Sequence, residues 1–162
     1  MAGLCRSYRH ALPGRSAITS IVYFTAVAHH RESRHPGTVA HQVAYFTALE
    51  ATGVQLQLGH FKAKSQACPL CGGTFVGWEE KETDVAIGAG LLELVCKDPC
   101  DTVVLVTGDT DLVPAIRTAR RLDSTKDLVA LQPYRRVNRE LSRCADRALT
   151  IRVASLRAAS AP

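Results

Sequence analysis

Two aspartates, Asp109 and Asp111, stand between a run of apolar β-branched residues and a helical pattern. Residues 102–106 predict a strand, Gly108 permits a sharp turn, and residues 112–122 predict a helix. Two carboxylates spaced two residues apart repel each other, and a bound cation relieves that repulsion. Hard oxygen ligands of this kind suit Mg²⁺ or Mn²⁺. The alternative is structural, with Asp111 capping the helix and Asp109 lying in a polar turn.

A second acidic cluster, residues 79–84, leads directly into a predicted helix over residues 83–96. Asp84 falls in the first turn of that helix, which can place it near the end of the strand and beside Asp109 and Asp111. The helix is expected to pack on the sheet through one of two apolar sets: Val85, Ala89, Leu92 and Val95, or Ile87, Leu91 and Leu94. The alternative is a solvated charge run favoured by the helix dipole. That alternative explains the glutamates better than it explains Asp84.

Arginines follow the acidic loop. They are Arg117, Arg120 and Arg121 on the helix of residues 112–122, and Arg135, Arg136, Arg139 and Arg143 near a helix predicted over residues 138–145. The candidates for phosphate binding beside a carboxylate–metal centre are Arg117, Arg121, Arg136 and Arg139. For any single arginine, a solvated basic face is the simpler explanation. The net charge of +5 fits a polyanionic partner without demonstrating one.

Cys68 and Cys71, in the sequence Cys-Pro-Leu-Cys-Gly-Gly, resemble half of a zinc knuckle. A structural zinc ion usually takes four ligands. Cys96 and Cys100 are poor candidates for the other half, because the helix between Asp84 and Cys96 spans about 18 Å at about 1.5 Å per residue. His60 is closer in sequence but lies on or beside a strand. The alternative is a pair of reduced thiols in a tight turn.

The elements that must position these residues alternate between strand and helix. Strands are predicted over residues 17–27, 54–58, 102–106, 128–131 and 149–153, and helices over residues 3–11, 38–51, 83–96, 112–122 and 138–145, with residues 60–78 irregular. This order predicts an α/β fold with a mainly parallel sheet and helices on both faces. The unbroken Val and Leu of residues 102–106 predict a strand buried on both faces. Ligands in such folds gather at the carboxyl ends of the strands.

Composition predicts one domain over residues 1–156 and a frayed tail over residues 157–162. Hydrophobic residues make up 46% of the 162-residue chain, which is enough for a core. No apolar stretch approaches the roughly 20 residues of a membrane span, and no secretory signal opens the chain. These features, with six cysteines that such a chain does not need as disulfides, predict a soluble cytoplasmic protein with reduced thiols.

The two acidic motifs in this order resemble the NYN domain family, the LabA-like branch of the PIN-like nucleases. The resemblance is carried by residues 79–85 and, about two dozen residues later, residues 107–116. It extends over nearly the whole chain through residues 22–26, 59–62, 139–141 and 145–146. The two motifs together are fairly specific, whereas either one alone is weak.

The resemblance implies a three-layer, Rossmann-like PIN/NYN fold and metal-dependent cleavage of RNA. Carried over residue by residue, it implies that Asp84, Asp109 and Asp111 bind Mg²⁺ or Mn²⁺ and that Thr107 orients water or substrate. Such domains usually open with a strand that ends in an Asp-Gly-x-Asn motif. Residues 1–16 contain no aspartate, so the first strand and its carboxylate are expected to be absent. A sheet edge left open in this way would favour a homo-oligomer.

Two rival functions remain at this stage. The first is a catalytically impaired NYN module that binds RNA or regulates, and the expected absence of the first-strand aspartate favours it. The second is a phosphatase-like hydrolase of small phosphoesters, which ranks lower because no nucleophilic aspartate motif follows an early strand. Metal-dependent cleavage of RNA separates the nuclease from the impaired module.

Overall fold

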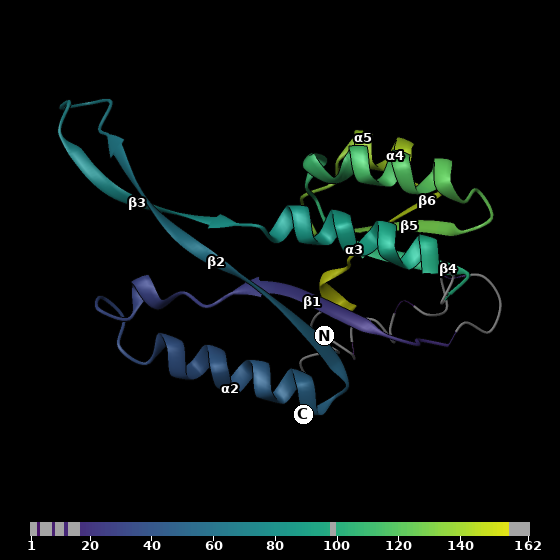
Figure 1. Cartoon of the computed structure of the whole chain (residues 1–162), viewed down its shortest axis with the longest axis horizontal. Coiled ribbons are helices and arrows are strands. Elements are labelled where there is room, and N and C mark those ends of the chain that lie inside the picture. The colour runs from purple at the N-terminus through teal and green to yellow at the C-terminus, as the bar shows by residue number, and fades with distance from the viewer. Residues whose placement is uncertain (1–2, 4–7, 9–11, 13–16, 98–99, 156–162) are drawn as a thin grey trace. The chain divides into compact units, whose positions relative to one another are not determined.

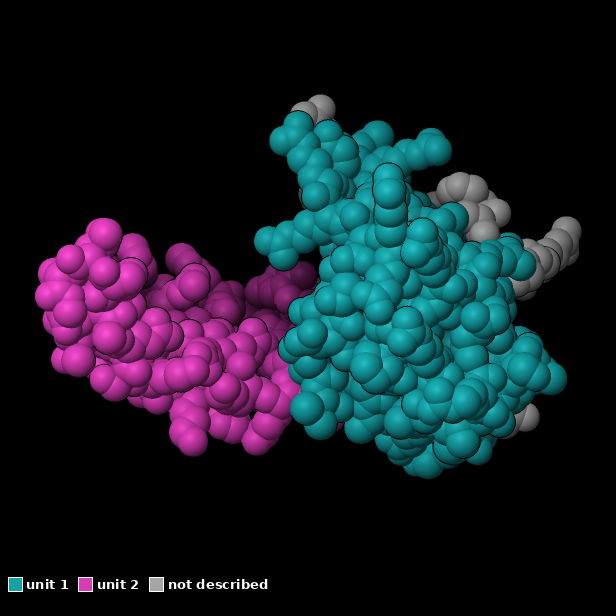
Figure 2. Space-filling view, turned by 90° about the horizontal axis from the view of Figure 1, so that it is seen from above, with its two compact units in different colours: residues 1–19, 84–162 teal, residues 20–83 magenta. Residues whose placement is uncertain are grey.

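The computed structural model of the chain describes residues 3, 8, 12, 17–97 and 100–155. It divides into two compact units (Figure 2). Residues 20–83 form the first, called here the hairpin unit, and residues 1–19 with 84–162 form the second, called the aspartate unit. The helix predicted over residues 3–11 and the tail over residues 157–162 fall almost entirely outside the described residues.

The hairpin unit is a three-stranded sheet with one long helix, α2 (Figure 1). Its elements are β1 (Ile21–Ala26), η2 (His29–Arg31), α2 (Thr38–Ala51), β2 (Val54–Ala67) and β3 (Thr74–Lys81). Strands β1 and β2 run parallel, whereas β2 and β3 run antiparallel. The prediction of a helix over residues 38–51 is confirmed, and its Phe46 and Leu49 are buried.

Glu32 fixes the start of α2. Its carboxylate accepts hydrogen bonds from the N–H groups of Gly37 at 2.7 Å and Val39 at 2.8 Å. These bonds satisfy two of the donors that a helix leaves unpaired in its first turn. The bonds from Val39 and Gly37 also lower the pKa of Glu32. The loop that precedes α2 is therefore held by a side chain and not left loose.

The prediction that residues 60–78 are irregular is wrong, because β2 and β3 pair there as a long hairpin. The pairing runs from His60 opposite Lys81 to Ala67 opposite Thr74. Most residues of this arm are exposed, and the alternation over residues 61–67 includes only one large apolar side chain, Phe61, so the strand signal is weak. Lysine, alanine and glutamine also have low strand propensity. The backbone pairing with β3 stabilises what local sequence does not indicate.

The aspartate unit is a parallel sheet with three helices packed on one face. Its strands are β4 (Thr102–Val106), β5 (Asp127–Gln132) and β6 (Arg147–Thr150), in that order. Its helices are α3 (Thr83–Lys97), α4 (Val113–Leu122), which follows η3 (Thr110–Leu112), and α5 (Arg139–Cys144). The core of this unit contains Leu91, Val95, Val103, Val113, Ile116, Ala119, Leu128, Leu141 and Cys144.

Two predicted packing faces differ from the structure. Strand β4 is buried on one face only, because Val103 lies in the core while Val104 and Val106 are 38% and 41% exposed. Helix α3 buries Leu91 and Val95 together with Gly88, whereas Val85 is 77% exposed. Of the first expected set, Val85 and Ala89 are exposed, whereas Leu92 and Val95 pack against or in the core. Of the second set, Leu91 is buried and Leu94 packs against the core, so the buried face combines members of both sets. Among the described residues, β4 is the edge strand of its sheet, and an edge strand is often packed on one face only.

The predicted fold class is confirmed. Helices alternate with strands except at the β2–β3 hairpin, and the strand pairs β1–β2, β4–β5 and β5–β6 are parallel. The strands form two three-stranded sheets, one in each unit. The last strand begins two residues earlier than predicted, at Arg147. Within the described residues, no helix combines the length and apolar character that crossing a membrane requires.

Candidate metal centre

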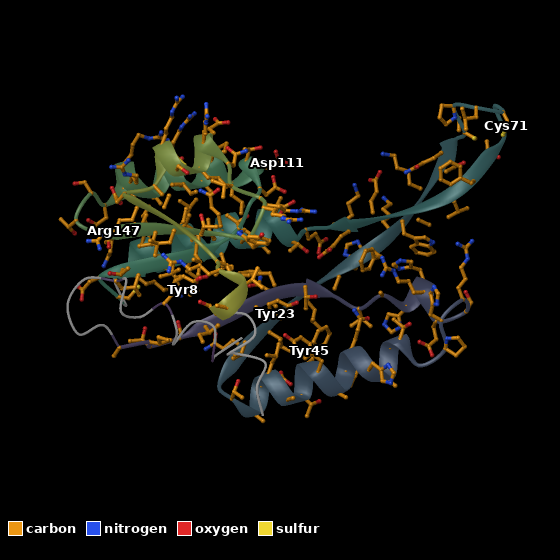
Figure 3. The ribbon with its side chains drawn as sticks, turned by 180° about the vertical axis from the view of Figure 1, so that it is seen from behind. Tyr8, Tyr23, Tyr45, Cys71, Asp111 and Arg147 are labelled. Atoms are coloured by element: carbon orange, nitrogen blue, oxygen red, sulfur yellow. The ribbon has the colours of Figure 1, made fainter. Side chains whose placement is uncertain are left out.

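Asp84, Asp109 and Asp111 come together in the aspartate unit, as the sequence predicted. One carboxylate oxygen from each lies within 4.8 Å of the others, and all three residues are exposed. Asp84 comes from the first turn of α3, and the other two come from the loop that joins β4 to α4. Figure 3 labels Asp111 among the side chains of this unit. The carboxyl end of a parallel strand and the first turn of a helix thus supply the cluster.

The loop after β4 is held by short-range hydrogen bonds. The Thr107 Oγ accepts a hydrogen bond from the Asp109 N–H at 3.0 Å. The Asp109 Oδ1 accepts one from the Asp111 N–H at 3.0 Å and so caps η3. The cap is therefore Asp109, and not Asp111 as the structural alternative proposed. Capping uses one oxygen of the Asp109 carboxylate, so it does not compete with cation binding by the other oxygen.

Gly108 brings this loop against the loop that follows β5. A Cβ atom at Gly108 would lie 3.1 Å from the Arg136 carbonyl oxygen and 3.2 Å from the Arg136 Cβ. A side chain at this position would require the facing loop to shift by a few tenths of an ångström. The Thr107 N–H donates a hydrogen bond to the Leu131 carbonyl at 3.2 Å, which joins the same two segments. These contacts therefore hold the acidic loop against the end of β5 and the loop that follows it.

A close helix contact places Asp84 beside this loop. At Gly88, a Cβ atom would lie 3.4 Å from the Cβ of Ala115 on α4. Asp84 lies four residues before Gly88, and Asp111 lies four residues before Ala115. Because four residues are about one helical turn, both aspartates sit one turn from the contact. The small residues Gly88 and Ala115 thus allow the two helices to come close at this point.

The donor set fits a hard divalent cation. Mg²⁺ binds oxygen at about 2.1 Å, so opposite oxygens of an octahedral site are about 4.2 Å apart. The spread of 4.8 Å needs only a small inward movement of exposed side chains to match this value. Among the described residues, no basic side chain forms an ion pair with Asp109 or Asp111. The charges of Asp109 and Asp111 would be neutralised by a bound cation.

Among the four candidate arginines, Arg136 places its carbonyl oxygen and Cβ against Gly108 of the acidic loop. Arg139 is the first residue of α5 and is exposed. Arg117 pairs with Glu140 at 3.3 Å across α4 and α5. Arg121 lies eight residues into α4, about 12 Å from the start of the helix, and its guanidinium donates to Thr118. The structure therefore places Arg121 away from the carboxylates.

Gln132 is a site-positioning residue that the sequence did not reveal. Its side chain is 1% exposed at the end of β5. Its Nε2 donates to the Ser142 Oγ at 2.8 Å, and its Oε1 accepts from the Asn138 N–H. The amide therefore ties the end of β5 to the start of α5, across the segment that carries Arg136. The one sequence feature that could have indicated this role is the position of Gln132, a polar residue directly after four apolar residues at the end of a strand.

The candidate zinc ligands Cys68 and Cys71 lie at the tip of the β2–β3 hairpin (Figure 3). The Cys68 N–H donates to the Gly73 carbonyl at 2.7 Å, and the Gly72 N–H donates to the Cys68 carbonyl at 2.9 Å. Hydrogen bonding from the N–H groups of Leu70 and Cys71, and from the Cys71 side chain, lowers the pKa of the Cys68 thiol. Such bonding favours a thiolate, which is the form that binds metal.

The other cysteines have different surroundings. Cys144 is buried, as predicted, while Cys5 lies outside the described residues. Burial raises the pKa of the Cys100 thiol. His60 is ruled out as a partner of Cys68, because it pairs with Lys81 at the opposite end of the arm. Seven residues of strand, about 24 Å, separate His60 from Ala67.

None of the curated proteins matches the chain. A crystal structure of a protein of unknown function from Vibrio parahaemolyticus is similar, with a TM-score of 0.60 at 18% identity, over 90% of this chain and 76% of that one. At that identity the likeness shows the fold alone, and the fold is consistent with the Rossmann-like PIN/NYN class. The NYN domain profile matches residues 5–152. Because the match spans most of its length, the chain belongs to the NYN domain family.

Proposed function

We propose that this chain is a divalent-metal-dependent ribonuclease of the LabA-like branch, with its cation bound by Asp84, Asp109 and Asp111. The observation that carries the proposal is the meeting of these three carboxylates within 4.8 Å. The family adds to it, because NYN domains belong to the PIN-like nuclease superfamily.

In the proposed phosphodiester hydrolysis, the aspartates and the arginines have different roles. Asp84, Asp109 and Asp111 would hold Mg²⁺ or Mn²⁺, which supplies Lewis-acid polarisation and neutralises charge on the phosphate. Arg136, which lies against the acidic loop, would hold a neighbouring phosphate, and Arg139 would extend that contact along the strand of RNA.

Thr107 would orient the attacking water or the substrate. Its Oγ already accepts the hydrogen bond from the Asp109 N–H, so its hydroxyl proton remains available to a water or phosphate oxygen. The same bond prevents the hydroxyl from rotating freely. Thr107 thus combines a structural bond with a place beside the carboxylates.

The remaining parts of the proposal concern extent and location. Residues 1–156 would act as one NYN domain composed of both units. The five described cysteines form no disulfide, which suits a reducing compartment such as the cytoplasm. The partner is RNA, and the positive net charge of +5 favours a polyanion.

Cleavage of a labelled single-stranded RNA in Mn²⁺ tests the proposal. Wild-type protein, Asp109→Asn and the control Asp101→Asn are compared, because Asp101 is an exposed aspartate at the other end of β4. Wild type and Asp101→Asn should cut, while Asp109→Asn should lose activity at least about 100-fold. Chelation of the metal should stop all cutting. Folded wild-type protein that binds RNA without cutting it would replace the nuclease by an RNA-binding module.

A further inference from the structure

The tip of the β2–β3 hairpin carries a pair of cysteines that the proposed nuclease chemistry does not use. The arm leaves the rest of its sheet early, because β1 pairs with β2 only as far as Gly59. Cys68 lies nine residues further along, which is about 30 Å of extended strand. Figure 1 shows the hairpin projecting beyond β1 and α2 within its unit. Because the arm is exposed, packing in the hydrophobic core does not account for its sequence.

The turn has the shape of a metal knuckle. Cys68 and Cys71 are both free thiols, and the crossed hydrogen bonds between Cys68, Gly72 and Gly73 fix the loop that joins them. Gly72 has a φ of 70°, which side chains rarely adopt. A Cβ at Gly73 would lie 3.4 Å from the Cys71 Sγ, so residue 73 is directly beside the sulfur. The backbone N–H groups of Leu70 and Cys71 bond toward the sulfur of Cys68.

The hairpin unit supplies only these two ligands. Residues 20–83 are all described, and Cys68 and Cys71 are their only cysteines. No histidine, aspartate or glutamate of this unit gathers with them. Zinc in a structural site is tetrahedral and takes four ligands, with thiolates among its preferred donors. A complete site therefore requires two ligands from outside the unit.

Apolar side chains around the thiols point to a protein partner. Leu70, between the cysteines, is 95% exposed, and Phe75 and Val76 near the tip are 49% and 63% exposed. A two-fold axis through a shared ion would bring the same residues of a second copy against them, as in other isologous interfaces. The second copy would then supply the two further ligands and would also cover the exposed apolar side chains.

We propose that Cys68 and Cys71 form half of a tetrathiolate zinc site that the same pair from a second copy of this chain completes, tip to tip. Zinc replaces the thiol protons, which pass to the solvent, and no electron is transferred. The hairpin is the arm that carries the site, and the carboxylate cluster takes no part in it. The inference therefore stands whether or not the chain cleaves RNA.

Metal analysis and analytical ultracentrifugation of the full chain test the proposal. The reduced, chelator-treated protein is titrated with Zn²⁺, and Co²⁺ is used as the spectroscopic probe. The proposal predicts one zinc ion for every two chains, doubling of the mass, and the absorption of tetrahedral Co²⁺ with four thiolates. One zinc ion per chain in a monomer, or no zinc at all, would overturn it.

Two double variants locate the ligands. Cys68→Ser with Cys71→Ser should abolish zinc binding and leave a monomer, while the control Cys96→Ser with Cys100→Ser should behave like wild type. Loss of zinc in the control would mean an intramolecular site and would sink the shared one. In wild-type protein, zinc should also slow alkylation of Cys68 and Cys71 at least tenfold and leave exposed Cys96 as reactive as before. That last measurement needs no variant to fold.

Discussion

Asp109 has two roles that substitution can separate. Its Oδ1 caps η3 through the Asp111 N–H, and its carboxylate belongs to the proposed cation site. Asparagine keeps an oxygen that can accept the capping bond but removes the charge, whereas alanine removes both.

Asp109→Asn should therefore unfold at nearly the wild-type temperature without divalent ions, and Asp109→Ala should lose about 1 kcal/mol of unfolding free energy. Both variants should lose the stabilisation that Mn²⁺ gives to wild-type protein. Thermal denaturation with and without Mn²⁺ measures both effects. Equal stabilities of the two variants would mean that the cap contributes nothing.

Cys68 should react with alkylating agents at lower pH than Cys100 and Cys144 do. Its pKa is lowered by backbone hydrogen bonding, while burial raises the pKa values of Cys100 and Cys144. In metal-free protein, the thiolate of Cys68 therefore persists to lower pH than the other two. Peptide mapping after brief alkylation should show the half-maximal rate of Cys68 at a pH below 9.0, the ordinary value for a thiol. Equal rates for Cys68 and Cys100 at neutral pH would contradict the lowered pKa.

At the scale of elements, the contact between α3 and α4 sets the distance from Asp84 to the acidic loop. Gly88→Leu would insert a side chain where a Cβ alone already lies 3.4 Å from Ala115. The substitution should cost about 1–3 kcal/mol of stability through overpacking. It should also weaken Mn²⁺ binding at least tenfold, because the two helix starts move apart.

Ala89→Leu is the matched control, since Ala89 is the exposed neighbour of Gly88 on the same helix. It should change neither property appreciably. Calorimetric titration of both variants with Mn²⁺ gives the comparison. Wild-type affinity in a folded Gly88→Leu variant would show that the helix spacing does not position the cluster.

Local sequence predicted the elements that bury a regular face. The helix over residues 38–51 is confirmed at both ends. The acidic loop follows the carboxyl end of β4, and Asp84 at the start of α3 lies beside it, as the sequence predicted. Long-range pairing was not predictable. Residues 60–67 lie on a polar, exposed strand, and their partner in β3 is indicated only by the structure. The exposure of one face of β4 was not predictable for the same reason. Whether Val104 is buried depends on which segments of the chain pack on that face, and local sequence does not show this.

At the scale of the whole molecule, the positive charge should govern binding of RNA. The chain carries a net charge of +5, and its arginines near the acidic loop should displace counterions from phosphates. Affinity for single-stranded RNA, measured with Asp109→Asn to prevent cleavage, should fall steeply as salt rises.

Adding Arg136→Gln should reduce the slope of log affinity against log salt by about 0.7, the value for one phosphate contact on a single strand. Adding Arg31→Gln instead should leave the slope unchanged, because Arg31 is an exposed arginine of the hairpin unit. Fluorescence anisotropy over a range of salt concentrations measures the slopes. An effect of equal size from both substitutions would indicate diffuse attraction without a defined phosphate contact.

The central claim is that Asp84, Asp109 and Asp111 act as one cation site. The most direct test is Mn²⁺ binding by calorimetry to the wild-type chain, to each single Asp→Asn variant of the three, and to Asp101→Asn. The site predicts one tight Mn²⁺ whose affinity falls at least about tenfold, or about 1.4 kcal/mol, in each of the three variants and is unchanged in Asp101→Asn. Wild-type affinity in any one of the three variants would contradict the claim.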